Sequence, residues 1–152
     1  METTIPVFSI DGTDINVQDV LSKLKFLSKI KKGEKLNVTS LTISEDTFFT
    51  NIQRYFHVLE SRDKTLEFIK RVSDDALNIA LKCLQSRDSF HHNIGRIVIS
   101  NLREIKGGID NLGSTYGEDR MFVAKIETFQ TLLDVKIMDL EEKSREARKQ
   151  QT

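Results

Sequence analysis

Few side chains in this sequence have the types and spacing that catalysis or metal binding requires. The three histidines are His57, His91 and His92. Adjacent residues on a helix point about 100° apart, so His91 and His92 would not turn their rings toward one metal ion. No cysteine or histidine lies at the ligand spacing of a zinc site from this pair. We therefore predict no metal site, and interpret the adjacent histidines as solvated or partly packed.

The charged run after Gly117 is a second candidate for chemistry. Glu118, Asp119 and Arg120 lie at a predicted helix junction. Acidic groups there stabilise the positive end of a helix, so we interpret them as capping residues rather than an acid–base set. The glycine pair after Lys106 lacks the following Lys-Ser/Thr of a phosphate-binding loop. Because no catalytic set converges, we predict that the protein is not an enzyme and uses no cofactor.

The most distinctive surface feature is a lysine-rich segment. Six lysines fall within thirteen residues and are opposed only by Glu34. On an amphipathic helix they could contact a protein, an acidic membrane surface or nucleic-acid phosphate, or they could form an ordinary solvated face. The predicted first helix contains no arginine, which makes phosphate binding the least favoured of these. The candidate partner-binding residues are Lys23, Lys25, Lys29, Lys31, Lys32 and Lys35.

The composition limits the partners and the number of domains. The 152 residues include 23 basic and 23 acidic side chains, so the net charge is zero. A field that attracts nucleic acid is absent, and weak mutual repulsion favours self-association or a place in a larger assembly. The length suits one domain with its own core. The single cysteine, Cys83, lies in an apolar helical stretch and is predicted to be a buried, inert thiol.

Apolar residues recur at three- and four-residue steps through most of the chain. This spacing predicts a mainly α protein, an antiparallel bundle of about five helices. The predicted helix starts are Asn16 or Asp14, Ser44, Ser61 or Asp63, Asp88 or Ser89, and Asp119. Gly33, after two lysines, predicts the end of the first helix. The apolar stripes cover residues 17–30, 48–59, 66–84, 90–116 and 122–140.

The fourth stripe continues without interruption across Gly107-Gly108. Two glycines lower helix propensity by about 2 kcal/mol, so a kink or break could occur there. Because the stripe is unbroken, we predict one long helix, with another element packed closely on the glycines.

The two ends of the chain differ from the helical domain, which we place at residues 17–140. Residues 1–16 are predicted to be an extended arm or a hairpin, since Asp11-Gly12 is a turn-forming dipeptide after an apolar run. The β-prone segment 36–43 could pair with this element. Residues 141–152 are almost entirely polar but helix-prone, which predicts either a solvated helical extension or a fraying tail.

Three segments carry a family resemblance. Residues 26–36 (FLSKIKKGEKL) resemble the motif FISKIKPGEKI, residues 61–69 (SRDKTLEFI) resemble SRETTLEFI, and residues 106–128 resemble KTGIxNL…TYxDDRMF…IET. In this order they are similar to a family of small helical proteins of nucleocytoplasmic large DNA viruses, the giant and algal viruses. The similarity covers roughly residues 14–137. The chain departs from it at Lys32, where the motif has proline, and at Gly107, where it has threonine.

The resemblance implies a viral origin and supplies no established activity. Viruses of this kind support jelly-roll capsid shells with small, often helical, minor proteins. We therefore expect a minor capsid or cementing component of the virion, made in the host cytoplasm. It would contact other capsid proteins through its termini and the lysine-rich segment, with a membrane surface as a further contact. A viral module for host interaction or replication is the alternative, and nucleic-acid packaging has only the lysines to support it.

Overall fold

The computed structural model describes residues 5–32 and 62–150. Its elements in chain order are β1 (Phe8–Ile10), β2 (Thr13–Ile15), α1 (Val17–Ser28), α3 (Arg62–Gln85), α4 (Ser89–Thr115) and α5 (Arg120–Gln150). The prediction of a mainly α protein with a small N-terminal β element is confirmed. The described residues contain four helices rather than five, and the stripe at 48–59 and the β-prone segment 36–43 lie outside them.

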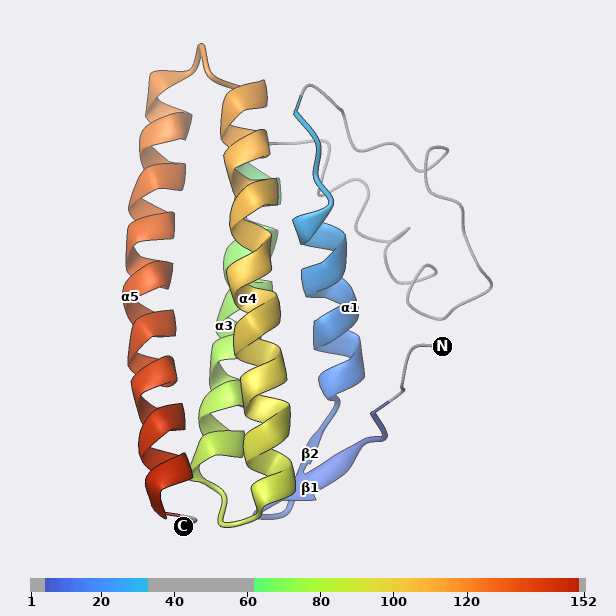
Figure 1. Cartoon of the computed structure of the whole chain (residues 1–152). Helices are drawn as coiled ribbons and strands as arrows, with labels where there is room; N and C mark the ends of the chain where they lie inside the picture. The colour runs from blue at the N-terminus through green and yellow to red at the C-terminus, as the bar shows by residue number, and fades with distance from the viewer. Residues whose placement is uncertain (1–4, 33–61, 151–152) are drawn as a thin grey trace.

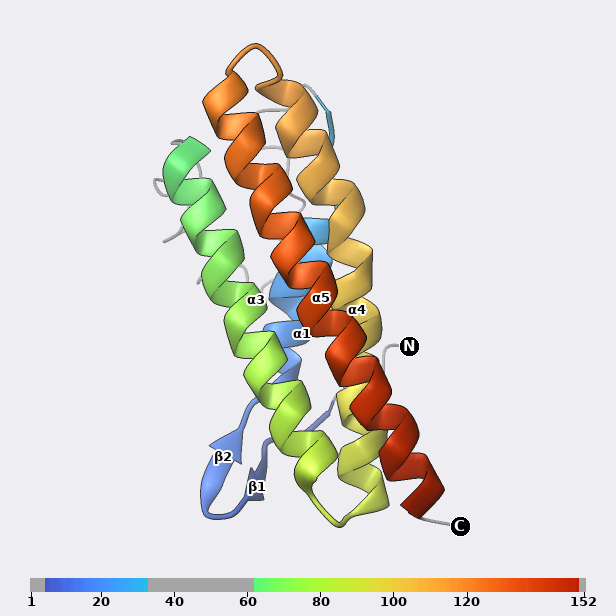
Figure 2. The same ribbon diagram turned by 90° about the vertical axis from the view of Figure 1, so that its left-hand side faces the viewer.

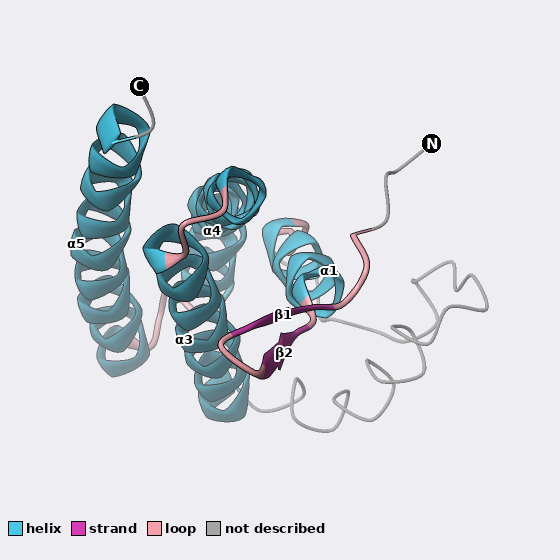
Figure 3. Ribbon diagram, turned by 90° about the horizontal axis from the view of Figure 1, so that it is seen from below, coloured by secondary structure: helices cyan, strands magenta, loops and turns pink. Residues whose placement is uncertain are grey.

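The helices α3 and α4 form the middle of the molecule, with α1 against one side and α5 against the other (Figures 1 and 3). Each outer helix contacts both middle helices. Figure 2 views the bundle from the side of α5, which lies across α3 and α4. The helices α3, α4 and α5 alternate in direction, as an antiparallel bundle requires, while α1 runs in the same direction as α4 (Figure 1).

The N-terminal segment forms a hairpin rather than an extended arm. Phe8 pairs with Ile15 and Ile10 with Thr13 in antiparallel register. The turn residues Asp11 and Gly12 both have positive φ, 51° and 80°, as a tight two-residue hairpin turn requires. Ile10 and Ile15 are buried in the main core, so the hairpin closes one end of the bundle.

Three of the five predicted helix starts are confirmed by capping contacts; Ser44 and Ser61 lie outside the described residues. The side-chain oxygen of Asn16 accepts a 3.1 Å hydrogen bond from the backbone N–H of Asp19 at the start of α1. Asp88 accepts one of 2.9 Å at the start of α4, and Asp119 accepts one of 3.1 Å at the start of α5. Each bond satisfies a backbone donor that the helix itself leaves unpaired.

The end of α1 was predicted wrongly. The position of Gly33 indicated a helix that continues to the lysines before it, whereas α1 ends at Ser28. The chain then turns so that Ile30 remains buried outside the helix. The side-chain amide of Asn111 donates a 2.8 Å hydrogen bond to the Ile30 carbonyl oxygen, so this tertiary contact holds the turn.

The helix α4 passes through Gly107-Gly108 without a break, as predicted. The expected close neighbour is the end of α1, because a Cβ added at Gly108 would overlap the backbone carbonyl group of Leu27. A Cβ at Gly107 would meet nothing within 4 Å. Only the second glycine is therefore needed for packing, and it lets the two helix backbones touch.

One hydrophobic core joins the hairpin and the four helices. Residues from all four helices are fully buried in it, and they include Leu24, Ile69, Leu102, Ile109 and Phe122. The polar segment after Leu140 belongs to α5, which continues to Gln150. Ser144 and Ala147 are buried in this last part, so one side of it packs against the protein.

Candidate functional site

The described lysines of the lysine-rich segment do not share one side of α1. Lys25 and Lys29 are exposed and lie one helical turn apart. Lys23 is two positions before Lys25, so it points to nearly the opposite side of the helix. Its side chain is only 19% exposed and forms a 3.0 Å ion pair with Asp19. Lys31 and Lys32 are exposed beyond the end of α1, and Lys35 lies outside the described residues.

The adjacent histidines pack at the turn between α3 and α4. The ring of His91 stacks on Phe8 with centroids 5.0 Å apart, and its Nδ1 shares a 2.6 Å hydrogen bond with Ser86 Oγ. His92 is buried, and its Nε2 donates to the Ser86 carbonyl oxygen. Of the two alternatives, solvated or partly packed, the structure shows packing: His91 joins the turn to Phe8 of the hairpin, and His92 bonds to the turn itself. Across residues 5–32 and 62–150, no three His, Cys, Asp or Glu side chains gather as metal ligands would.

Cys83 is a buried free thiol, as predicted. Burial raises the pKa of its thiol to about 11, so the thiol is protonated at neutral pH and a poor nucleophile. Its Cβ lies against Gly95, where α3 and α4 approach closely. The residue therefore acts in packing.

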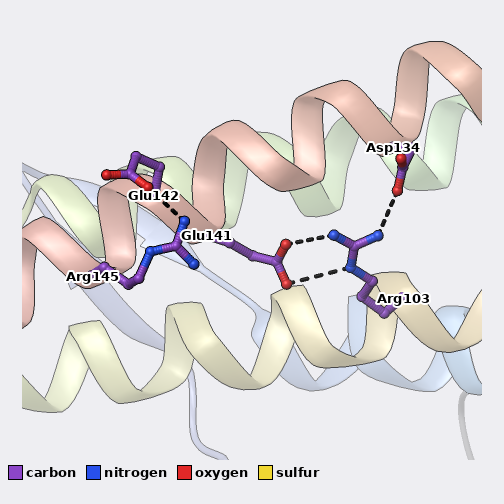
Figure 4. A network of polar contacts seen from close by, with 5 residues as sticks. All are labelled: Arg103, Asp134, Glu141, Glu142 and Arg145. Atoms are coloured by element: carbon purple, nitrogen blue, oxygen red, sulfur yellow. Dashed lines mark hydrogen bonds and ion pairs between the residues drawn. The ribbon is translucent and has the colours of Figure 1, made fainter.

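A polar cluster fixes α5 to α4. The guanidinium of Arg103 on α4 contacts Asp134 at 2.5 Å and Glu141 through two nitrogens, both carboxylates being on α5 (Figure 4). The hydrogen bonds to Glu141, followed by those to Asp134, raise the pKa of Arg103 above its ordinary value. The neighbouring pair Arg145–Glu142 lies within α5 alone. Because Arg103 joins two helices, this cluster adds a polar contact to the buried side chains that already pack α5 against the bundle.

An open groove lies between α3 and α5, on the side of α5 away from Arg103. It has a volume of about 450 Å³, and a second hollow of about 370 Å³ lies along the same two helices. Leu77 and Leu133 line its floor, and lysines stand at its rim. Together the two hollows are lined by Lys70, Asp74, Leu77, Leu81, Ala124, Lys125, Thr128, Phe129, Leu132, Leu133, Val135, Lys136, Asp139, Leu140 and Lys143. We call this the α3/α5 groove.

Large apolar side chains stand exposed at the α3/α5 groove. Leu132 is 57% exposed and Val135 is 60% exposed, beside the partly buried Leu77 and Leu81 of α3. A folded domain normally covers such neighbouring side chains, so they mark this groove as the candidate binding site. Apolar spacing alone does not reveal this groove, because it identifies only the side of α5 that faces the core. The sequence does contain a sign of it, since Leu132 and Val135 are apolar but do not belong to the stripe of α5 that was predicted to face the core.

No helix in the described part of the chain is long and apolar enough to cross a membrane. Comparisons with protein-family models, with curated proteins and with solved structures found no match for this chain.

Proposed function

We propose that the protein is a non-enzymatic structural component of a viral particle, a minor capsid or cementing protein that works by binding other proteins. The observation that supports the binding role is the α3/α5 groove, where Leu132 and Val135 are exposed beside apolar residues of α3. The viral part of the proposal is supported by the resemblance of residues 26–36, 61–69 and 106–128 to the family of large DNA viruses.

The groove has the properties of a site for a helix. Two neighbouring helices present apolar side chains between charged rims, which is the arrangement that receives the apolar face of a partner helix. The floor is rigid, because Leu133 and Phe129 are buried in the hydrophobic core. A rigid site loses little conformational entropy on binding, so its contacts can contribute fully to affinity.

Mass spectrometry of purified virions tests the structural role. We expect the protein to be present in a fixed ratio to the capsid proteins and to remain after a high-salt wash, because apolar contacts are not screened by salt. Absence from intact particles, with the protein present in infected cells, would reject the virion role and favour the alternative of a non-virion binding module.

Lysine cross-linking in intact particles tests which surface makes the contact. The α3/α5 groove has Lys70, Lys125 and Lys136 at its rim, and α1 carries the exposed Lys25 and Lys29 as an internal control. We expect cross-links from the groove lysines to neighbouring protein chains in the particle, among which further copies of this chain count. Cross-links from Lys25 and Lys29 alone would place the contact on α1 and contradict the proposed site.

A further inference from the structure

The outward side of α5 carries three residues at equal intervals. Lys125, Leu132 and Asp139 are seven positions apart, so they lie almost in line along the helix. All three are exposed and line the α3/α5 groove. The cation and the anion are therefore about 10 Å on either side of the central leucine, at 1.5 Å per residue.

We propose that the α3/α5 groove is covered by the same groove of a second copy of this chain, with the two α5 helices antiparallel and the two-fold axis beside Leu132. This inference deepens the proposed function and rests on it, because both take the α3/α5 groove as the binding surface. It names a second copy of this chain as the partner that occupies the groove. In such a symmetric interface each contact occurs twice. If residue i of one copy meets residue j of the other, then residue j of the first copy also meets residue i of the second.

The equal spacing makes the surface self-complementary in charge. With the axis at Leu132, a residue seven positions before it faces the residue seven positions after it in the other copy. Lys125 of each copy then faces Asp139 of the other. Asp139 also forms a 2.6 Å pair with Lys143 on its own helix. That pair is exposed and one turn apart, and such pairs contribute little, so Asp139 can turn to a second lysine.

The apolar residues occupy the centre of the proposed interface. Leu132 lies on the axis and Val135 lies one turn away, beside Leu77 and Leu81 across the groove. A second copy would bring the same four side chains, so the centre would be apolar and the charges would lie outside it. Stable interfaces between identical chains have this arrangement of apolar core and polar rim.

The α3/α5 groove carries both signs of charge, with four lysines and two aspartates among its lining residues. The groove contains Asp74 and Asp139 as well as lysines, so a strongly acidic helix would meet like charges there. A strongly basic helix would meet the lysines. The chain as a whole has zero net charge, so two copies approach without long-range repulsion. A second copy is selected by the placement of Lys125 and Asp139 on opposite sides of Leu132, which brings opposite charges together although lysines outnumber aspartates in the groove.

Analytical ultracentrifugation of the purified full-length protein tests the proposal. We expect a dimer of the 17.5 kDa chain at micromolar concentrations. Leu132→Asp should weaken dimerisation at least tenfold while leaving the circular dichroism spectrum unchanged, since the residue is exposed in the single chain. Met138→Asp is the matched control, because Met138 is 55% exposed on the same helix but does not line the groove. It should dimerise like the original protein.

Charge exchange identifies the register. Lys125→Glu alone and Asp139→Lys alone each place like charges opposite one another, so each should weaken self-association by about tenfold or more. A mixture of the two variants restores both oppositely charged contacts and should form a mixed dimer. The double variant should again dimerise with itself. No heterologous partner predicts this rescue.

The outcomes separate this inference from the proposed function. A purified protein that stays monomeric at all concentrations overturns the dimer, and so does a dimer that survives Leu132→Asp. Single charge variants that dimerise normally, or a mixture that fails to associate, overturn the register. None of these results changes whether the protein is found in virions, and its absence from virions would not change the sedimentation result.

Discussion

The two sides of the central pair α3–α4 are covered in different ways. On one side, α1 approaches so closely that Gly108 of α4 contacts the backbone of Leu27, and Leu24 and Leu27 are fully buried. On the other side, α5 is joined to α4 through the long side chain of Arg103, and it leaves Leu132 and Val135 exposed beside a groove. On the first side the two helix backbones are in contact, whereas on the second α5 leaves apolar side chains exposed at the groove.

The difference follows from which groups touch. Two helix backbones can meet only where one residue has no side chain, so the α1 side depends on a single glycine and on the Asn111 hydrogen bond beside it. On the α5 side the contact that Arg103 makes is between side chains, and hollows remain beside that helix. Besides the α3/α5 groove, a hollow of about 280 Å³ lies between α4 and α5 beside Arg103. In this protein, therefore, binding is expected on the less tightly packed side.

Two adjacent leucines give the largest expected contrast within α5. Leu133 is 6% exposed and belongs to the core, so Leu133→Ala should lower the free energy of unfolding by about 3 to 4 kcal/mol. Leu132 points outward, so Leu132→Ala should lower the free energy of unfolding of the single chain by less than about 0.5 kcal/mol. Urea denaturation at low protein concentration measures both. Equal losses would mean that α5 has no exposed side.

The adjacent glycines of α4 give the next contrast. Gly108→Ala forces its new methyl group into the backbone carbonyl of Leu27, so we expect a loss of about 2 to 3 kcal/mol of unfolding free energy. Gly107→Ala adds a methyl group in open space and should instead gain up to about 1 kcal/mol from helix propensity. Thermal denaturation of the two variants should shift in opposite directions. A harmless Gly108→Ala would show that α1 does not contact α4 as described.

The Asn111 contact is a smaller part of the same side. Asn111→Ala removes the hydrogen bond to the Ile30 carbonyl oxygen, which should cost about 1 kcal/mol of unfolding free energy. Asn101→Ala is the control, because Asn101 bonds only to Ile97 on its own helix. Hydrogen exchange at the end of α1 should quicken in the first variant and stay unchanged in the second. Faster exchange in Asn101→Ala than in Asn111→Ala would show that the Asn111 hydrogen bond does not hold the end of α1.

The Arg103 cluster gives the smallest expected effect. Its guanidinium is 40% exposed, so solvent screens the pairs, and Arg103→Ala should cost about 0.5 kcal/mol of unfolding free energy at low salt. The loss should shrink as the salt concentration rises. Arg145→Ala, which breaks a pair within α5, should leave stability unchanged. A loss that is large and independent of salt would mean that Arg103 acts as a buried anchor.

Local features were predictable wherever neighbouring residues decide the structure. The caps at Asn16, Asp88 and Asp119 were identified from side chains that bond to nearby backbone donors. The Asp11-Gly12 turn was likewise evident from residue types that tolerate positive φ. The end of α1 was not predictable, because Asn111, far along the chain, holds the Ile30 carbonyl oxygen after the helix has stopped.

The candidate site was the least predictable part. The lysines were conspicuous because they are close in sequence, yet helix geometry separates Lys23 from Lys25 and Lys29. Leu132 and Val135 were inconspicuous because an apolar residue in an amphipathic helix is normally assigned to the core. Their exposure follows from which side of α5 meets α3 and α4, and that depends on several helices together.

By itself, the sequence determined that the chain forms long amphipathic helices, where three of them begin, and that a turn at Asp11-Gly12 precedes them. These properties follow from contacts between residues a few positions apart. Only the tertiary structure decided which glycine admits a second backbone, where α1 ends and which apolar residues of α5 remain uncovered. Those depend on the distances between whole helices, which the packing of many distant side chains sets at once.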